Sequence, residues 1–441
     1  MRQAPRIAAF FCLAGLITAA ASGQQAPYRL TIEDAIQKGL QANLGVLMAG
    51  TRVEEAEGAR TRSFSAALLP RVNMQTYTNL QNRNLRAFGI SVPGMPDVVG
   101  PFANYDFRVY AQQNVLDLQN YRNLKASERA VEASKMDYQD ARDLIVRSIA
   151  GLYLEAQSAA ARSAAAESRV TDSTALYKLA KDKHDAGTAT GVDVLRAQVQ
   201  LANDRQALLI AVNLHKQSLL VLGRNMGMSP ATPLELAEPL AFRPIEQPEI
   251  ETLATAALQA RADYLSFAKQ RQQLLEQQSA NRARSLPRMS VSGNYGGIGR
   301  TLGGIAATGL IQGQIDFTLF DRDRNGEAEQ LAARVKRVDD QIADLRRGIE
   351  EELRVALLNL DSAAQQAAVA KEGQELARRE LQMAQDRFQQ GTANNVEVVT
   401  AQDELARAEE NYILAVTSHA DAKFALAGAM GGTEQNIGKY R

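Results

Sequence analysis

The sequence predicts a mainly α-helical fold with membrane β-strands, built from a helix–hairpin–long-helix unit that occurs twice. Three observations lead to this prediction: a repeated segment, two very long stretches without proline, and four short segments of strand-like alternation. The repeated segment at 186–198 reads AGTATGVDVLRAQ, and it recurs at 390–402 as QGTANNVEVVTAQ. Because the chain contains two copies of one unit, the duplication sets its architecture.

The repeat extends well beyond this segment. Leu-Pro-Arg at 69–71 returns at 286–288, and Val-Leu-Asp at 115–117 corresponds to Leu-Phe-Asp at 319–321. Each copy should run through a helix, a Leu-Pro stop, two strands, a very long helix, a Gly-Thr turn and a final helix. The expected divisions are a signal peptide at 1–23, a first repeat at 24–228, a Pro-rich equatorial segment at 229–248, a second repeat at 249–432 and a C-terminal tail at 433–441. Strands are expected at about 70–82 and 105–117 in the first repeat, and at about 287–300 and 308–320 in the second.

The N-terminus has the features of a secretory signal. Arg2 and Arg6 precede an apolar run at 7–21, and small residues at 21–23 form a cleavage site. A membrane anchor is the alternative, but the run is shorter than the roughly 20 residues that a spanning helix needs. Cys12 is the only cysteine and lies in this run, so the mature chain should have neither a disulfide nor a lipid anchor.

Four segments alternate between apolar and polar residues, as barrel strands do. In the first, Val72, Met74 and Thr76 alternate with polar neighbours, and similar patterns occur at 107–112, 289–295 and 311–319. One apolar and one polar face over about ten residues is typical of a strand between lipid and water. Two surface hairpins on a soluble domain would show the same pattern. Since four strands cannot close a barrel and an open edge is not tolerated in lipid, the membrane interpretation requires an oligomer.

Two stretches are expected to be exceptionally long helices. Residues 119–184 and 323–388 contain no proline, and at about 1.5 Å per residue each could span on the order of 100 Å. Apolar residues recur every three or four positions, as at Ile349, Leu353 and Leu360, and form a narrow Ala-rich stripe. Such helices are too long for a globular core, and they indicate coiled-coil rods or barrel staves.

The repeated turn should end one long helix and start the next. Its glycine suits the positive φ of a helix stop, the residue three places later is a good N-cap, and the acid three places further completes a capping-box-like pattern. These positions are Gly187, Thr190 and Asp193 in the first copy and Gly391, Asn394 and Glu397 in the second. Each turn therefore predicts an antiparallel helical hairpin.

Taken together, the signal peptide, the tandem repeat, Leu-Pro before a strand, Leu-Phe-Asp before a long helix and the Gly-Thr turn resemble the TolC-type outer-membrane efflux channel family over essentially the whole mature chain. The resemblance implies a homotrimer with a twelve-stranded barrel in outer-membrane lipid, continued by a long periplasmic α-helical barrel. It also implies a passive exit duct of a tripartite efflux or type I secretion system. The duct would be gated at its periplasmic tip by an adaptor (membrane fusion) protein and an inner-membrane pump.

The resemblance places the gate at the two turns. Asp193 and Glu397 become candidate acidic tip residues, although capping alone would also explain them, and Phe388 stands where an aromatic often lies. Ala393 replaces the basic linking residue of some relatives, and Thr400 replaces a second acid, so a salt-bridge latch is not expected. The tip and gate candidates are Gly187, Thr188, Thr190, Val192, Asp193, Phe388, Gly391, Thr392, Asn394, Val396 and Glu397.

Other functions find little support. Fifty basic and fifty acidic residues give zero net charge, which leaves no electrostatic basis for binding nucleic acid. Asp321 to Gly326 resembles the start of a calcium loop, but Ala332 stands where a bidentate Glu is needed, so a strand-to-helix turn is expected. His184, His215 and His419 lack metal-ligand spacing.

We therefore expect no enzymatic activity, no metal and no cofactor. The rival function is that of a structural or adhesive periplasmic coiled-coil protein without a pore. Within the channel interpretation, drugs, metal ions and a secreted protein all remain open as cargo.

Overall fold

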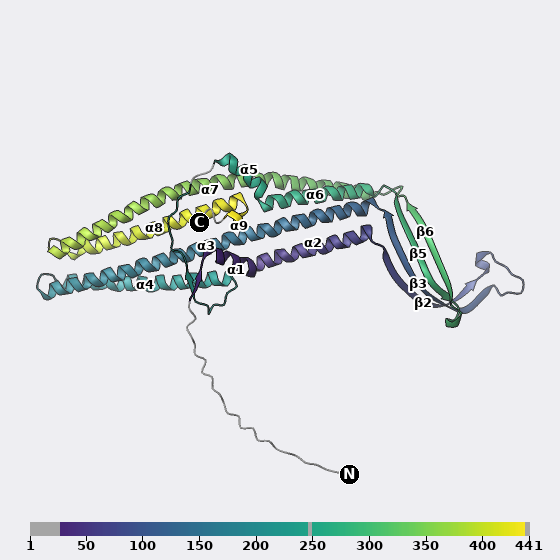
Figure 1. The fold of residues 1–441 in the computed structure, drawn as a ribbon, viewed down its shortest axis with the longest axis horizontal. Helices are drawn as coiled ribbons and strands as arrows, with labels where there is room; N and C mark the ends of the chain where they lie inside the picture. The colour runs from purple at the N-terminus through teal and green to yellow at the C-terminus, as the bar shows by residue number, and fades with distance from the viewer. Residues whose placement is uncertain (1–26, 246–248, 437–441) are drawn as a thin grey trace, which may run out of the picture.

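A computed structural model describes residues 27–245 and 249–436, so the expected signal peptide and the end of the tail lie outside it. The helices lie side by side in one long rod, and a four-stranded sheet continues from one end of it (Figure 1). The helices are α1 (Ile32–Ala42), α2 (Leu44–Leu68), α3 (Leu118–Asp185), α4 (Gly191–Asn225), α5 (Ile250–Ala260), α6 (Ala262–Ala283), α7 (Asp323–Gln390), α8 (Asn395–Met430) and the short α9 (Thr433–Asn436). The strands are β1 (Tyr28–Leu30), β2 (Arg71–Asn84), β3 (Val98–Leu116), β4 (Leu234–Leu236), β5 (Arg288–Gly299) and β6 (Ala306–Asp316).

The element order repeats itself, as the sequence predicts. The first copy is α2, β2, β3, α3 and α4, and the second is α6, β5, β6, α7 and α8. The long helices α3 and α7 have 68 residues each. Along α7, the side chains of Ile349, Leu353, Ala356 and Leu360 are all buried, which confirms the apolar stripe. No helix in the described ranges is long and apolar enough to cross a membrane.

The sheet has the order β2-β3-β5-β6, and every pair in it is antiparallel. The pairing register puts Met74 beside Val109, and Val109 beside Tyr295. Because side chains alternate between the faces of a strand, this register gathers the predicted apolar residues of all four strands on one face. The members of this apolar face include Val72, Met74, Phe107, Val109, Met289, Val291, Tyr295, Ile311 and Ile315. The strands β2 and β6 remain as its two open edges.

The strand bounds correct the sequence expectations in two places. The first hairpin is longer than expected, because β2 and β3 continue past an irregularity after Gln81 and pair as far as Asn84 with Val98. The strand β6 ends at Asp316 rather than near residue 320. Asp316 pairs with Arg288, and the residue before Arg288 is Pro287, which has no N–H to continue the ladder.

A compact collar surrounds the middle of the rod. The two-stranded parallel sheet of β1 and β4 packs there with α1 against α3, and the Tyr153 hydroxyl donates to the Leu30 carbonyl oxygen at 3.2 Å. The expected tail at 433–441 instead begins with α9. Arg142 of α3 forms an ion pair with Glu434 at 2.6 Å, and Asp143 accepts from the Glu434 N–H. A four-residue helix held by such contacts has no periodicity that a sequence could reveal.

Three acids on one face of α3 also lie at this collar. Asp137 accepts a hydrogen bond from Ser266, and Asp143 caps α9, whereas Asp140 lies near Asp263 and Arg261. Burial, reinforced by the neighbouring carboxylates, raises the pKa of Asp140 to about 6. At neutral pH the folded chain therefore holds an ionised carboxylate in an unfavourable place.

We predict that Asp140→Asn stabilises the protein at pH 7.5. The raised pKa means that the native state binds a proton more readily than the unfolded chain, so the wild type recovers this stability as pH falls through 6. The gain at pH 7.5 should be on the order of 1 kcal/mol after solvent screening, and it should shrink by pH 5. Thermal melting at both pH values measures it. Asp344→Asn, which changes an exposed ion pair on α7, is the matched control and should alter neither melt.

Candidate functional site at the helical tips

The turns between α3 and α4 and between α7 and α8 lie together at the end of the rod opposite the sheet (Figure 1). Both turns use the same helix stop. Gly187 has φ +75° and Gly391 has φ +79°, and open space surrounds each Cα, so the left-handed backbone rather than crowding requires glycine. The following threonines, Thr188 and Thr392, each donate both N–H and Oγ1 to the carbonyl oxygen five residues earlier, at 2.8 to 3.1 Å.

The helix starts differ between the two copies. Thr190 and Asp193 form a complete capping box, in which Thr190 accepts from the Asp193 N–H and Asp193 accepts from the Thr190 N–H at 3.1 Å. Asn394 accepts from the N–H groups of Val396 and Glu397, but Glu397 returns no bond. The expected second capping box is therefore incomplete. Arg387, one turn before the glycine, attracts the Glu397 carboxylate instead, at 3.1 Å.

The apolar candidates separate into buried and exposed ones. Phe388 is 4% exposed and belongs to a core cluster with Leu381 and Val398. Its position is that of a packing residue within the chain, with the Lys183 ammonium 5.6 Å from its ring centroid. Val192 and Val396, in the first turns of α4 and α8, are exposed.

Polar contacts join the two hairpins, and the sequence did not reveal them. Asn395 Nδ2 donates to the Asp193 carbonyl oxygen at 2.8 Å, and Lys183 Nζ donates to the Gln389 carbonyl oxygen at 3.1 Å. Both acceptors are main-chain atoms, so no complementary residue type appears in the sequence. The only signal available was that Asn395 is a second asparagine directly after the cap.

The same interface contains polar groups that are buried without full pairing. Asn395 is fully buried, yet its Oδ1 has no hydrogen-bond partner in the described part of the chain. Gln402, two turns along α8, is 7% exposed, and neither its Oε1 nor its Nε2 has a partner there. Each unpaired buried group costs on the order of 1–3 kcal/mol. These unpaired groups reduce the net stabilisation that packing of the two hairpins gives at the tip.

Acidic groups extend this interface away from the tip. Burial raises the pKa of Asp172, of Asp204 and of Glu409, although Arg169 opposes the shift at the last two. Arg378 adds a longer ion pair to Glu409 at 3.7 Å. We call these three acids the interface acids.

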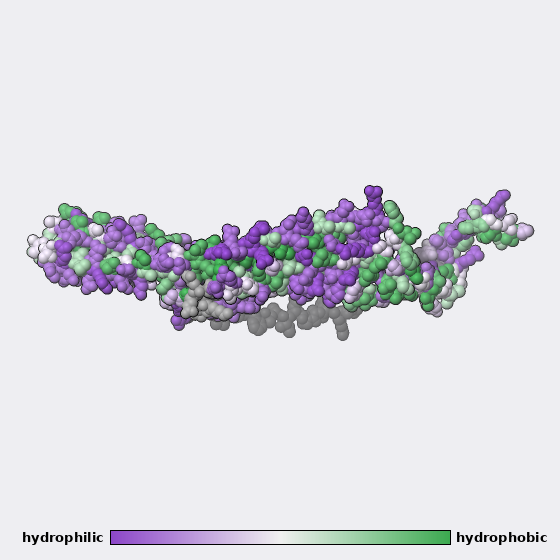
Figure 2. Space-filling view, turned by 90° about the horizontal axis from the view of Figure 1, so that it is seen from above, coloured by the Kyte–Doolittle hydropathy of each residue, from purple (hydrophilic) through white to green (hydrophobic). Residues whose placement is uncertain are grey.

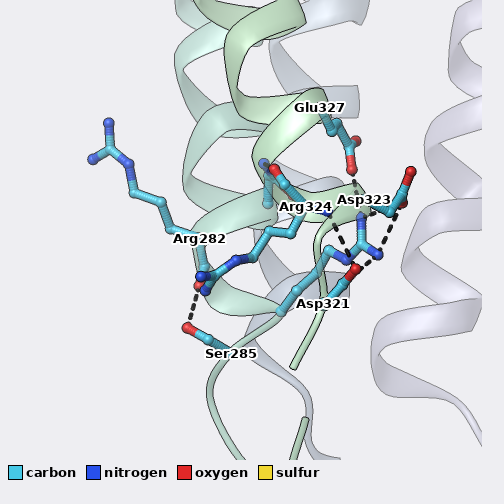
Figure 3. Close-up of polar contacts among 8 residues, drawn as sticks. Arg282, Ser285, Asp321, Asp323, Arg324 and Glu327 are labelled. Atoms are coloured by element: carbon cyan, nitrogen blue, oxygen red, sulfur yellow. Dashed lines mark hydrogen bonds and ion pairs between the residues drawn. The ribbon is translucent and has the colours of Figure 1, made fainter. Parts of the chain in front are cut away.

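The segment that resembles the start of a calcium loop, Asp321 to Gly326, lies at the other end of the rod and forms ion pairs there. Arg284, at the end of α6, contacts Asp321 at 2.6 Å, Asp323 at 3.2 Å and Glu327 at 2.7 Å (Figure 3). The Arg324 N–H donates to Asp321 Oδ1 at 3.2 Å, so this acid supports the start of α7. The carboxylates thus build a strand-to-helix turn, and the described residues contain no cluster of three or more His, Cys, Asp or Glu that could hold a metal.

The fold is a rod of two helical hairpins with a sheet that has two open edges, and it is similar to that of several solved outer-membrane proteins. OprN is 19% identical with a TM-score of 0.75, covering 91% of this chain and 90% of that one. VceC from Vibrio cholerae is 18% identical with a TM-score of 0.76, covering 91% and 96%. The open state of MtrE from Neisseria gonorrhoeae is 14% identical with a TM-score of 0.75, covering 91% and 89%. At these identities the likeness shows the fold.

The family follows from the sequence itself. The outer membrane efflux protein profile matches residues 35–227 and 253–432, which is most of the chain, with one match in each repeat. The chain belongs to the outer membrane efflux protein family. No curated protein matches it closely enough for comparison by sequence.

We predict unequal effects of removing the two tip acids. Asp193→Ala breaks a capping box and should cost α4 about 1 kcal/mol, seen as severalfold faster amide exchange in its first turn. Glu397→Ala breaks only an exposed ion pair and should leave exchange in α8 nearly unchanged. Asn394→Ala, which removes the cap itself, is the control that should speed exchange there. Equal effects of the two acid substitutions would contradict the asymmetry.

The interface acids predict a pH dependence of hairpin packing. Their pKa values are raised in the packed state, so packing takes up protons and should strengthen as pH falls from neutral toward 5. Protection of the tip amides from exchange, corrected for the intrinsic rate, measures this. The triple variant Asp172→Asn, Asp204→Asn and Glu409→Gln should be insensitive to pH over that range. A wild type with equal protection at both pH values would refute the prediction.

Proposed function

We propose that this chain forms a homotrimeric, passive exit duct in the outer membrane with a long periplasmic extension. At rest the duct is closed at the helical tip, and a periplasmic adaptor and an inner-membrane pump open it in a tripartite efflux or type I secretion system. The observation that supports this most strongly is a second apolar stripe on the long helices, which the single chain leaves uncovered.

The helix α7 carries two stripes at heptad spacing. One is buried within the chain, and the other points outward, with Leu358 and Val369 about as exposed as any apolar side chain of the rod at 70% and 69%. The helix α4 has the same property, with Leu209 at 73% exposed. The outward residues of α7 are Val355, Leu358, Val369, Leu376 and Met383, and those of α4 include Val192, Leu195, Val199, Leu209 and Leu220.

Helices with two apolar stripes need a neighbour on each side. In a single chain the outer helices lack one neighbour, whereas a closed ring of chains gives every helix two. The open strand edges β2 and β6 make the same demand, because unpaired backbone groups are not tolerated in lipid. Three copies, the number that the TolC-type resemblance implies, would supply twelve strands and close both rings together.

The two faces of the sheet suit lipid and water respectively. Figure 2 shows hydrophobic residues gathered over the strands next to the helical rod. Ile311 and Met74, on the apolar face, are 86% and 67% exposed in the single chain. The opposite face carries the Asp106–Arg108 ion pair at 2.5 Å, which would face a water-filled lumen.

The rod is built so that its hairpins can separate at the tip and stay joined at the collar. At the collar, Ile149 and Tyr153 of α3 and Phe424 of α8 belong to one large apolar cluster. Near the tip the shared apolar cluster is built mainly of smaller residues, and Asn395 and Gln402 interrupt it. Separation there would let water pair these groups, so an adaptor would have little free energy to overcome.

Single-channel recording of the purified protein in planar bilayers tests the proposal. Trimers that conduct in small, infrequent openings are expected, and a monomer without conductance would refute it. Replacing Asp193 by Asn and Glu397 by Gln tests whether these acids also attract cations. Unchanged cation preference would leave them with the capping and ion-pair roles alone.

We predict that Lys183→Ala makes opening at least about tenfold more frequent. The substitution removes the Lys183–Gln389 hydrogen bond between hairpins, worth about 1 kcal/mol, in each of the three chains. Lys181→Ala, two residues earlier on an exposed part of α3, is the matched control and should open as rarely as wild type. Equal open probabilities for both variants would show that the contact does not hold the tip closed.

A further inference from the structure

Two of the three most exposed large apolar side chains of the described chain lie in the short link between β6 and α7. Leu319 is 98% exposed and Phe320 is 85% exposed. This link is not a free loop, because the next residue, Asp321, is fixed by Arg284 at 2.6 Å (Figure 3). Their counterparts in the first repeat, Val115 and Leu116, belong instead to strand β3. The link therefore presents two large apolar groups, in a fixed place, to nothing in their own chain.

An unfilled hollow lies beside the opposite edge of the sheet. It has a volume of about 620 Å³ and lies where α2 ends and β2 begins. Ala66, Leu69, Pro70 and Val72 supply apolar walls, Arg62 and Arg71 supply positive charge, and the rest of the lining is polar: Ser65, Gln112, Asn114 and Asn120. No carboxylate lines it. We call it the α2–β2 pocket.

Closure of the sheet brings these two features together. The strands β2 and β6 are the two edges, and both meet the helical rod, since Arg71 begins β2 and Asp316 ends β6. If β6 of one copy pairs antiparallel with β2 of the next, the link that follows Asp316 must pass beside the residues that precede Arg71. Leu69 and Pro70, which directly precede Arg71, form one wall of the α2–β2 pocket.

We propose that Leu319 and Phe320 of one copy fill the α2–β2 pocket of the next copy and lock the junction between the strand and helix layers. This inference rests on the proposed closed trimer and adds a defined interlock to it. Charge suits the same occupant: Asp316 ends the strand before the link, and the pocket offers two arginines. The residues of the Leu-Phe-Asp motif thus have two roles. Leu319 and Phe320 contact the neighbouring copy, and Asp321 anchors the link.

Disulfide trapping between chains provides the test. The only natural cysteine is Cys12, in the expected signal peptide, so the background is clean. Leu69→Cys and Phe320→Cys are placed on separate, differently tagged chains and co-expressed, so that a link can form only between copies. Oxidised trimers should contain a crosslinked heterodimer. Replacing Phe320→Cys by Leu302→Cys, which is 66% exposed but at the far hairpin of the sheet, should give none.

A second variant tests the energetic role. Phe320→Ser should weaken each interface roughly tenfold or more, because burial of a Phe side chain is lost, and trimers should dissociate at a lower temperature. Leu302→Ser is the control and should dissociate like wild type.

The outcomes separate the two proposals. A wild type that forms trimers, without the crosslink and without an effect of Phe320→Ser, overturns the interlock and leaves the channel intact. If the crosslink is absent and the trimers retain phospholipid that Arg62→Ala releases, the pocket binds a lipid headgroup. That outcome also overturns the interlock. A wild type that forms no trimer overturns the proposed function itself.

Discussion

The outer elements of this chain, the helices α4 and α7 and the strands β2 and β6, each have two sides to cover, and the chain covers only one of them. The helix α7 buries Leu353 and Leu360 against its own hairpin and leaves Leu358 and Val369 outside. The sheet pairs β3 and β5 on both sides and leaves β2 and β6 each with an unpaired edge. Burial of apolar surface and pairing of backbone N–H and C=O groups are the two strongest demands on any fold. Here the uncovered apolar residues and the unpaired strand edges both lie on the outside of the single chain. An isolated copy therefore leaves both demands unmet, and the proposed closure into a ring would satisfy them in a single step.

Polar groups are distributed unevenly along the rod. At the collar the chain uses large, fully packed side chains such as Tyr153 and Phe424, and it adds α9 through the Arg142–Glu434 pair. At the tip it places Asn395 and Gln402 in the same kind of interface without partners for all their atoms. The middle of the rod is held by a large apolar cluster, and the tip by a smaller apolar cluster and a few hydrogen bonds. Packing between the hairpins is thus most stabilising at the collar, where the rod must stay closed, and less stabilising at the tip, where a duct would have to open.

The sequence predicted most of the architecture, because that architecture is periodic. Duplication, heptad spacing and two-residue alternation each repeat over many residues, and the pairing register gathered Val72, Val109, Tyr295 and Ile311 on the face that alternation assigned to them. Glycine and the cap residues were predictable too, since their roles depend on local backbone geometry. Prediction failed where one distant residue decided the outcome. Pro287, directly before the neighbouring strand β5, ended β6 early, and Arg387 drew Glu397 away from the cap. The burial of Phe388 belongs to the same group, because it depends on four helices meeting.

The two tip turns differ because the acid of the second turn contacts Arg387 and not its own helix start. Both stop the preceding helix in the same way, through a left-handed glycine and a threonine that donates twice. In the first copy the acid is bound into its own helix start, which makes the beginning of α4 a rigid unit. In the second copy the acid reaches back to Arg387 and ties the end of α7 to the start of α8. The tie is exposed, and so it is worth little in water. Both helix starts are capped, but only α4 has the reciprocal bond of a complete capping box, so the corner between α7 and α8 changes its angle at the smaller cost. Of the two hairpins, the α7–α8 pair is therefore the one better suited to move when the tip opens, with the α3–α4 pair as the firmer support.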